Sequence, residues 1–144
     1  MTIGVDFYTF ELKREEIHIR LQIWDLGGQP QFKGLLPAYR GGTNAAIVMY
    51  DLTRYSSLQH LEEWIDFIRE ENVTIPILIV GSKLDLEDRI CVKQADVEPY
   101  LNKYAFGHCR CSSKTGTGIE DILSLIADAT LKYMSEKSKN LRKN

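Results

Sequence analysis

The amino-acid sequence predicts an α/β fold: a mostly parallel sheet with helices on both faces and an antiparallel hairpin at its edge. Two apolar runs, at residues 45–50 and 75–80, have the length and composition of strands buried on both faces. From residue 45 onward such strands alternate with helical patterns, which is typical of a parallel sheet covered on both sides. The first part of the chain has a different pattern and predicts the hairpin.

The hairpin is predicted from residues 4–24. Residues 4–13 mix β-branched and aromatic side chains with polar ones, as a strand does. Residues 17–24 alternate between apolar and polar with a period of two, which indicates a strand with two different faces. A charged turn at residues 13–16 joins them. Residues 25–30, with a glycine pair and a proline, end the strand and predict a loop.

Helices are predicted after each of the later strands. Residues 56–59 fit a capping box, and apolar residues then recur at helical spacing as far as Ile68. Residues 93–104 form a second predicted helix, in which Pro99 causes a kink or marks a late start. Residues 108–111 are predicted as a short strand. Gly118 precedes a strongly apolar helical pattern.

Composition limits the class of protein. With 144 residues, 26% charged and 44% hydrophobic, the chain is expected to be one folded domain, spanning residues 1–134, with a polar, basic and frayed tail at 135–144. The net charge of −2 gives no reason to expect nucleic-acid binding. The apolar runs are too short for an integral membrane segment, and no signal peptide is apparent. A cytoplasmic protein is the expectation.

Ligands of parallel sheets bind beyond the carboxyl ends of the strands, so the chemistry is expected in the loops there. These are residues 25–29, 51–54, 81–86 and 112–118. The first offers a carboxylate, two glycines that let a backbone amide approach an anion, and a side-chain amide. That set suits a metal-bound phosphate with a water to position, and it equally suits a tight turn with a capping Asp.

The two later loops suit a base. Asp85 follows the second buried run and could accept two hydrogen bonds from the N–H and NH₂ of guanine, while the Lys83 stem lies along the ring. Residues 111–116 could donate backbone amides to a ligand carbonyl. A solvated loop for the first segment and a helix-entry loop for the second are the alternatives.

Together these motifs resemble the small GTPases of the Ras superfamily, which have a P-loop NTPase-like fold. Residues 1–7 resemble the first switch of the Rab branch, and residues 23–29 resemble the second switch with the double glycine of the Arf branch. Residues 48–53 are again Rab-like. Residues 81–85 resemble the guanine motif Asn-Lys-x-Asp, and residues 112–114 resemble the Ser-Ala-Lys loop. The resemblance covers essentially the whole chain.

The resemblance implies GTP or GDP and Mg²⁺ as ligands, and it implies roles on the phosphate side. Thr2 would bind Mg²⁺ through its hydroxyl, and Asp25 would hold the metal through water. The backbone amide of Gly28 would contact the γ-phosphate. Gln29 would be the catalytic residue that orients the attacking water.

The resemblance also implies roles on the base side. Lys83 would pack on the base and Asp85 would select guanine. Ser113 would donate its backbone amide to the guanine carbonyl, with Ser112 and Lys114 shaping the loop.

The sequence departs from the family pattern in two places. Ser82 replaces Asn at the start of the guanine motif, and a hydroxyl has a shorter reach and a single donor, so affinity is expected to fall. None of the ten glycines is followed by Lys, so the phosphate-binding loop is missing. We expect an N-terminally truncated domain that begins at the first switch, with Met1 an internal start in a longer gene product.

Two functions are predicted. The first is a GTP/GDP molecular switch with Mg-dependent hydrolysis, whose switches contact effectors, exchange factors and GTPase-activating proteins. Phe7, Trp24 and Tyr39 are candidates for an effector-facing aromatic patch, with ordinary packing as the alternative. The second is a non-catalytic pseudo-GTPase interaction module, which the missing loop and Ser82 favour. No cysteine lies near the end of the sequence, so no prenylation is expected.

Overall fold

The computed structural model describes residues 4–28, 34, 37–70 and 72–142. The chain divides into two compact units, residues 1–43 and residues 44–144. The first unit holds the hairpin and a short helix, α1 (Pro37–Arg40), and the second holds the parallel sheet and the remaining helices.

The hairpin of the first unit confirms the prediction from the alternating pattern. Strand β1 (Val5–Arg14) pairs antiparallel with β2 (Ile17–Leu26) along all ten residues of each. Glu15 makes the turn with a φ of +50°. The second strand runs through Leu26, two residues farther than its predicted end at residue 24. Most side chains of the ladder are exposed, so the hairpin has almost no core of its own.

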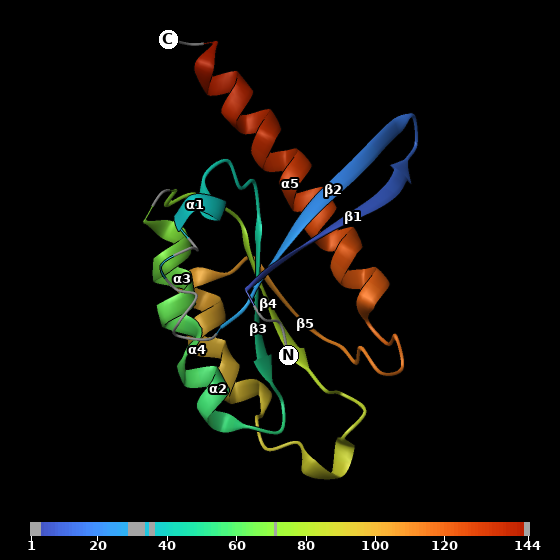
Figure 1. The fold of residues 1–144 in the computed structure, drawn as a ribbon, viewed down its shortest axis with the longest axis vertical. Coiled ribbons are helices and arrows are strands. Elements are labelled where there is room, and N and C mark those ends of the chain that lie inside the picture. The colour runs from blue at the N-terminus through green and yellow to red at the C-terminus, as the bar shows by residue number, and fades with distance from the viewer. Residues whose placement is uncertain (1–3, 29–33, 35–36, 71, 143–144) are drawn as a thin grey trace. The chain divides into compact units, whose positions relative to one another are not determined.

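The second unit is built on three parallel strands in the order β3-β4-β5 (Figure 1). These are β3 (Ala46–Asp51), β4 (Ile77–Ser82) and β5 (Gly107–Arg110), all within a residue or two of the predicted positions. The central strand β4 is buried from Ile77 through Gly81, as predicted. The expectation that the first run is buried on both faces was wrong, because β3 is an edge strand of its sheet and Met49 is 53% exposed.

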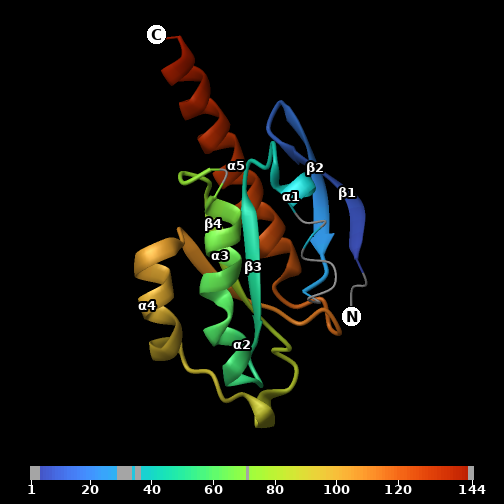
Figure 2. The same cartoon turned by 60° about the vertical axis from the view of Figure 1, so that its left-hand side comes forward.

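Helices cover both faces of this sheet, as predicted. Helices α2 (Tyr55–Gln59), α3 (Leu61–Arg69) and α4 (Gln94–Tyr104) lie on one face, and α5 (Ile119–Leu141) lies on the other (Figures 1 and 2). The core under the first three is apolar and tightly buried. Its members include Val48, Leu52, Leu58, Leu61, Ile65, Ile79 and Val97. A short 3₁₀ turn, η2 (Glu87–Arg89), connects β4 to α4.

Two predicted helix ends differ from the structure. The predicted capping box was wrong, because α2 begins at Tyr55, after Arg54, rather than after Ser56. The Ser57 hydroxyl donates to the Arg54 carbonyl at 2.6 Å instead. Helix α5 continues through Leu141, so most of the predicted tail from residue 135 is helical. Among the residues that the structure describes, no helix is both long enough and apolar enough to span a bilayer.

Candidate functional site

The loops that follow β3, β4 and β5 meet at one end of the sheet, because parallel strands present their carboxyl ends at the same edge. Backbone hydrogen bonds join them. The Leu52 amide donates to the Ser82 carbonyl at 3.1 Å, and the Leu84 amide donates to the Cys111 carbonyl at 2.9 Å. The loops after β4 and β5 are therefore joined directly through their backbones.

Asp85 and Ser112 are brought together by these loops. The Ser112 hydroxyl donates to Oδ1 of Asp85 at 2.6 Å, and the Ser112 side chain is only 1% exposed. The same hydroxyl oxygen accepts a hydrogen bond from the Thr115 amide at 3.2 Å. Asp85 is half-buried, so its carboxylate is fixed in direction while part of it still faces solvent. A fixed, partly open carboxylate is suited to accept hydrogen bonds from a ligand.

Ser113 and Lys114 lie in the turn that follows and are both exposed. The turn is closed by the Gly116 amide, which donates to the Ser112 carbonyl at 2.8 Å. Both predicted residues therefore stand on the same loop as the buried Ser112. The turn leaves their side chains open to solvent, and neither contributes to the core.

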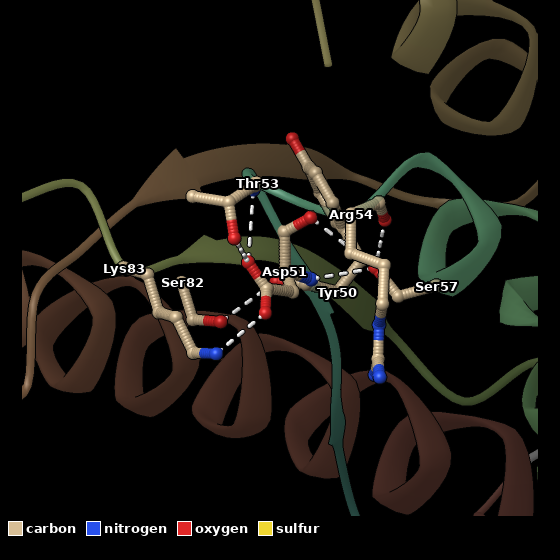
Figure 3. A network of polar contacts seen from close by, with 7 residues as sticks. All are labelled: Tyr50, Asp51, Thr53, Arg54, Ser57, Ser82 and Lys83. Carbon is tan, nitrogen blue, oxygen red and sulfur yellow. Dashed lines mark hydrogen bonds and ion pairs between the residues drawn. The ribbon is translucent and has the colours of Figure 1, made fainter. Parts of the chain in front are cut away.

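The Lys83 side chain extends toward the end of the neighbouring strand β3. Its ammonium group lies 2.6 Å from Oδ2 of Asp51, the last residue of β3 (Figure 3). Oδ1 of Asp51 accepts from the amide of Thr53 at 2.8 Å and from the hydroxyl of the same residue at 2.6 Å. The Asp51 side chain is 12% exposed and the Lys83 side chain 55% exposed. A largely buried carboxylate therefore anchors a largely exposed lysine.

The environment of Asp51 favours its ionised form. Burial raises the pKa of its carboxyl, but the hydrogen bonds from Lys83 and Thr53 and the Lys83 charge outweigh burial, so the net pKa lies below its usual value. The ion pair with Lys83 is therefore charged on the Asp51 side at neutral pH.

Ser82 is turned toward the protein. Its hydroxyl donates to the Tyr50 carbonyl at 2.9 Å and so ties the ends of β3 and β4 together (Figure 3). The single donor of this hydroxyl is therefore already used within the sheet.

The predicted phosphate-side residues belong to the first unit. Thr2 and Gln29 lie outside the described residues. Asp25 is exposed on β2, opposite Asp6 in the antiparallel register. Gly28 is exposed just after the strand ends. The hairpin end is closed by the Gly27 amide, which donates to the Gly4 carbonyl at 2.8 Å.

Three aromatic rings contact one another in tilted arrangements beside this end of the hairpin. The ring centroids of Phe7 and Trp24 are 4.8 Å apart, and those of Trp24 and Tyr39 are 5.2 Å apart. Phe7 is 47% exposed and Trp24 46% exposed. The rings therefore pack on one another, while Phe7 and Trp24 still present a face to solvent.

The described residues contain no group of three or more His, Cys, Asp or Glu side chains that could hold a metal ion. Mg²⁺ does not require such a cage, because it keeps several waters and takes one or two protein oxygens together with phosphate oxygens. The exposed carboxylate of Asp25 has the oxygen chemistry that this ion prefers.

Sequence reasoning missed Asp51 and Thr53 as site residues. The loop at residues 51–54 was expected to carry chemistry because it follows a buried strand, but no residue in it was assigned a role. The signal was present in the parallel topology, since the last residue of β3 is in register with Ser82, immediately before Lys83.

The geometry therefore gathers the predicted base-side residues at one end of a parallel sheet and leaves Asp25 and Gly28 on the hairpin. A family model described as the Ras family matches residues 1–132. Since that match covers most of the chain, this protein belongs to the Ras family of small GTPases.

Proposed function

We propose that this chain is a guanine-nucleotide switch that binds GTP and GDP through the loops after β4 and β5. The observation that carries the proposal is the hydrogen bond between Ser112 and Asp85, which joins the two loops and fixes a partly exposed carboxylate. Guanine presents an N–H and an NH₂ side by side, and one carboxylate can accept from both. Adenine lacks that pair of donors.

The neighbouring residues support the same ligand. The exposed stem of Lys83 offers an apolar surface on which a flat base can lie. Ser113 stands in an exposed turn, where its backbone amide is proposed to donate to the guanine carbonyl. Lys114 and Ser112 shape that turn. Ser82 is proposed to act by holding the ends of β3 and β4 together, because its hydroxyl donates to the Tyr50 carbonyl.

The phosphate-side roles follow from family membership. Asp25 is proposed to hold Mg²⁺ through water, Thr2 to bind the metal directly, and the Gly28 amide to contact the γ-phosphate. Gln29 is proposed to orient the water for hydrolysis. Bound Mg²⁺ supplies charge neutralisation for the phosphates, and loss of the γ-phosphate would release both switch segments, which effectors and regulators would sense.

Nucleotide binding with a fluorescent GTP analogue tests the base-side assignment. Asp85→Asn should weaken guanine binding at least about tenfold, because it removes a charge-assisted acceptor, and should shift preference toward xanthine. Asp88→Asn, an exposed carboxylate three residues on, is the matched control and should leave affinity unchanged. Unchanged guanine selectivity in Asp85→Asn would refute the assignment.

Hydrolysis is tested separately by phosphate release in the presence of Mg²⁺. Gln29→Leu keeps the approximate size of the side chain and removes the amide that is proposed to position the water. The rate should fall sharply while nucleotide affinity stays the same. An unaltered rate would remove Gln29 from the mechanism.

A second candidate is a non-catalytic interaction module with an effector-like face. The contacting rings of Phe7, Trp24 and Tyr39 favour it, because Phe7 and Trp24 are exposed and exposed aromatic rings are typical of protein-binding surfaces. Binding of the GTP analogue separates the two functions when measured on this chain and on any form extended upstream. Binding by the extended form alone supports the switch in a longer product, and binding by neither supports the interaction module.

A further inference from the structure

The end of β3 holds a carboxylate whose direction is determined before any ligand arrives. Thr53 donates to Oδ1 of Asp51 twice, from its backbone amide and from its hydroxyl. The Asp51 amide also donates to the Ser57 hydroxyl at 2.8 Å. These bonds fix both the backbone and the side chain of Asp51, and they leave Oδ2 to face Lys83 (Figure 3).

The backbone of Lys83 is held equally firmly. Its φ of +64° lies in the left-handed region, which a lysine adopts only when its surroundings require it. The residues on either side are tied down, since the Ser82 hydroxyl donates to the Tyr50 carbonyl and the Leu84 amide donates to the Cys111 carbonyl. The backbone of Lys83 and its ammonium group are therefore both held in defined positions.

A lysine held at both ends has an ordered methylene stem. An unpaired, exposed lysine samples many rotamers and loses that freedom when a ligand packs against it. Here the ion pair with Asp51 removes much of the freedom in advance, while more than half of the side chain stays open to solvent. A base that lies along the stem would meet a surface that is already formed.

We propose that Asp51 is a positioning residue for nucleotide binding: it anchors the ammonium group of Lys83 so that the lysine stem is preorganised for the guanine base. This inference rests on the proposed function. Asp51 makes no contact with the base itself, and its effect passes entirely through Lys83.

The ion pair is tested first without nucleotide. Acetylation of lysines by an activated ester, followed residue by residue with mass spectrometry, reports how freely each amine reacts. Asp51→Asn keeps the shape of the side chain and should raise the labelling of Lys83 severalfold relative to Lys132, an exposed lysine on α5. Asp66→Asn, an exposed carboxylate on α3, is the matched control and should change nothing. Unchanged labelling of Lys83 in Asp51→Asn would overturn the proposal.

Nucleotide affinity then tests the role. Asp51→Asn should weaken GDP binding about tenfold, the size expected from the rotamer freedom of one lysine. Lys83→Met keeps an apolar stem and removes the ammonium group. If Asp51 acts through Lys83, the double variant binds GDP no more weakly than Lys83→Met alone. Additive losses would assign Asp51 a general structural role and overturn the proposal.

The outcomes separate this inference from the proposed function. GDP binding that Asp51→Asn leaves unaffected overturns the role of Asp51 alone. If neither this chain nor a form extended upstream binds guanine nucleotide, the proposed function fails and this role fails with it. Should Asp51→Asn not fold, the pKa of the Asp51 carboxyl is measured by NMR titration in Lys83→Met. It should rise above the parent value, and an unchanged value would overturn the proposal.

Discussion

Gly118 lies where the chain passes from the loop after β5 into α5, and two independent constraints require glycine there. Its φ is +78°, and a Cβ added to it would lie 2.3 Å from the Arg110 carbonyl oxygen. Gly116, two residues earlier, has a similar φ of +80°, but a Cβ there would meet nothing within 4 Å. Comparing the two glycines therefore separates the cost of the backbone conformation from the cost of a steric clash.

Gly118→Ala is expected to destabilise the protein more than Gly116→Ala. The left-handed conformation costs about 1–2 kcal/mol in either variant. The clash with the backbone of Arg110 adds about 1–3 kcal/mol in Gly118→Ala only, because a backbone atom cannot move aside as a flexible side chain does. Urea unfolding of both variants measures the difference, and equal losses would show that the loop relaxes without cost.

His108 on β5 is linked to Tyr50 on β3 across the intervening strand. The Tyr50 hydroxyl and Nε2 of His108 lie 3.0 Å apart, and the space between the two strands is open because Gly81 has no side chain. Burial raises the pKa of Tyr50 to about 12, so the phenol stays protonated at neutral pH. Burial and the nearby Arg110 charge lower the pKa of His108 below 6.5.

The sign of this pKa shift predicts acid sensitivity. Because the folded-state pKa of His108 lies below its unfolded value, the folded protein binds fewer protons, and the free energy of unfolding falls as pH drops below about 6.5. The contribution is fully present above that pH. Denaturant unfolding at pH 7.5 and at pH 5.5 should show a smaller loss in His108→Gln than in the parent. His60→Gln, an exposed histidine, is the control, and an equal loss in all three proteins would contradict the assignment.

Residue types could be assigned from the sequence more readily than residue partners. Asp85 and Ser112 were both predicted because each follows a strand in a recognisable motif. The hydrogen bond between Ser82 and the Tyr50 carbonyl and the ion pair between Lys83 and Asp51 were not predicted. Both join residues about thirty positions apart, and such contacts depend on the register of neighbouring strands, which a single sequence does not specify.

At the scale of elements, β4 and β3 differ in how much they contribute to stability. Ile79 on β4 is fully buried between the strands and the helices, whereas Met49 on β3 is half-exposed. Ile79→Ala should lower the free energy of unfolding by about 2–5 kcal/mol. Met49→Ala should lower it by about 1 kcal/mol or less. Chemical denaturation measures both, and a comparable loss in Met49→Ala would mean that the edge strand is covered in solution.

The helix pattern was recovered better than the helix ends. Apolar spacing predicted the buried faces of α3 and α5, because that spacing follows from helix geometry. The predicted capping box at residues 56–59 failed because the Ser57 hydroxyl has another partner. It accepts from the Asp51 amide and donates to the Arg54 carbonyl, and so supports the turn that leaves β3. Serines near a helix start have several backbone partners within reach, and tertiary structure selects among them.

At the scale of the whole molecule, the two units differ in burial. The second unit has a continuous apolar core, while the side chains of the hairpin ladder are mostly exposed. An isolated two-stranded hairpin is marginal in water. Amide hydrogen exchange should therefore be faster in β1 and β2 than in β4, whose residues open only with global unfolding. Exchange followed by mass spectrometry checks this, and equal protection of β1 and β4 would contradict it.

The sequence was sufficient to predict the fold class, the two sheet types and the family, which the match over residues 1–132 bears out. Such features are encoded in periodicity and local motifs along the chain. The placement of the hairpin at the edge of the parallel sheet stays a prediction. So do the roles of Thr2 and Gln29, which lie outside the described residues.

The outer side of β3 has a consequence for handling the protein. Among the residues that the structure describes, this strand forms a ladder with β4 only, so the amides and carbonyls along its other side have no strand partner. An apolar strand that forms a ladder on one side only can act as a template for strands of other molecules. Solutions of this chain should therefore self-associate as concentration rises, and a lysine at position 49 should suppress the effect without disturbing the buried core.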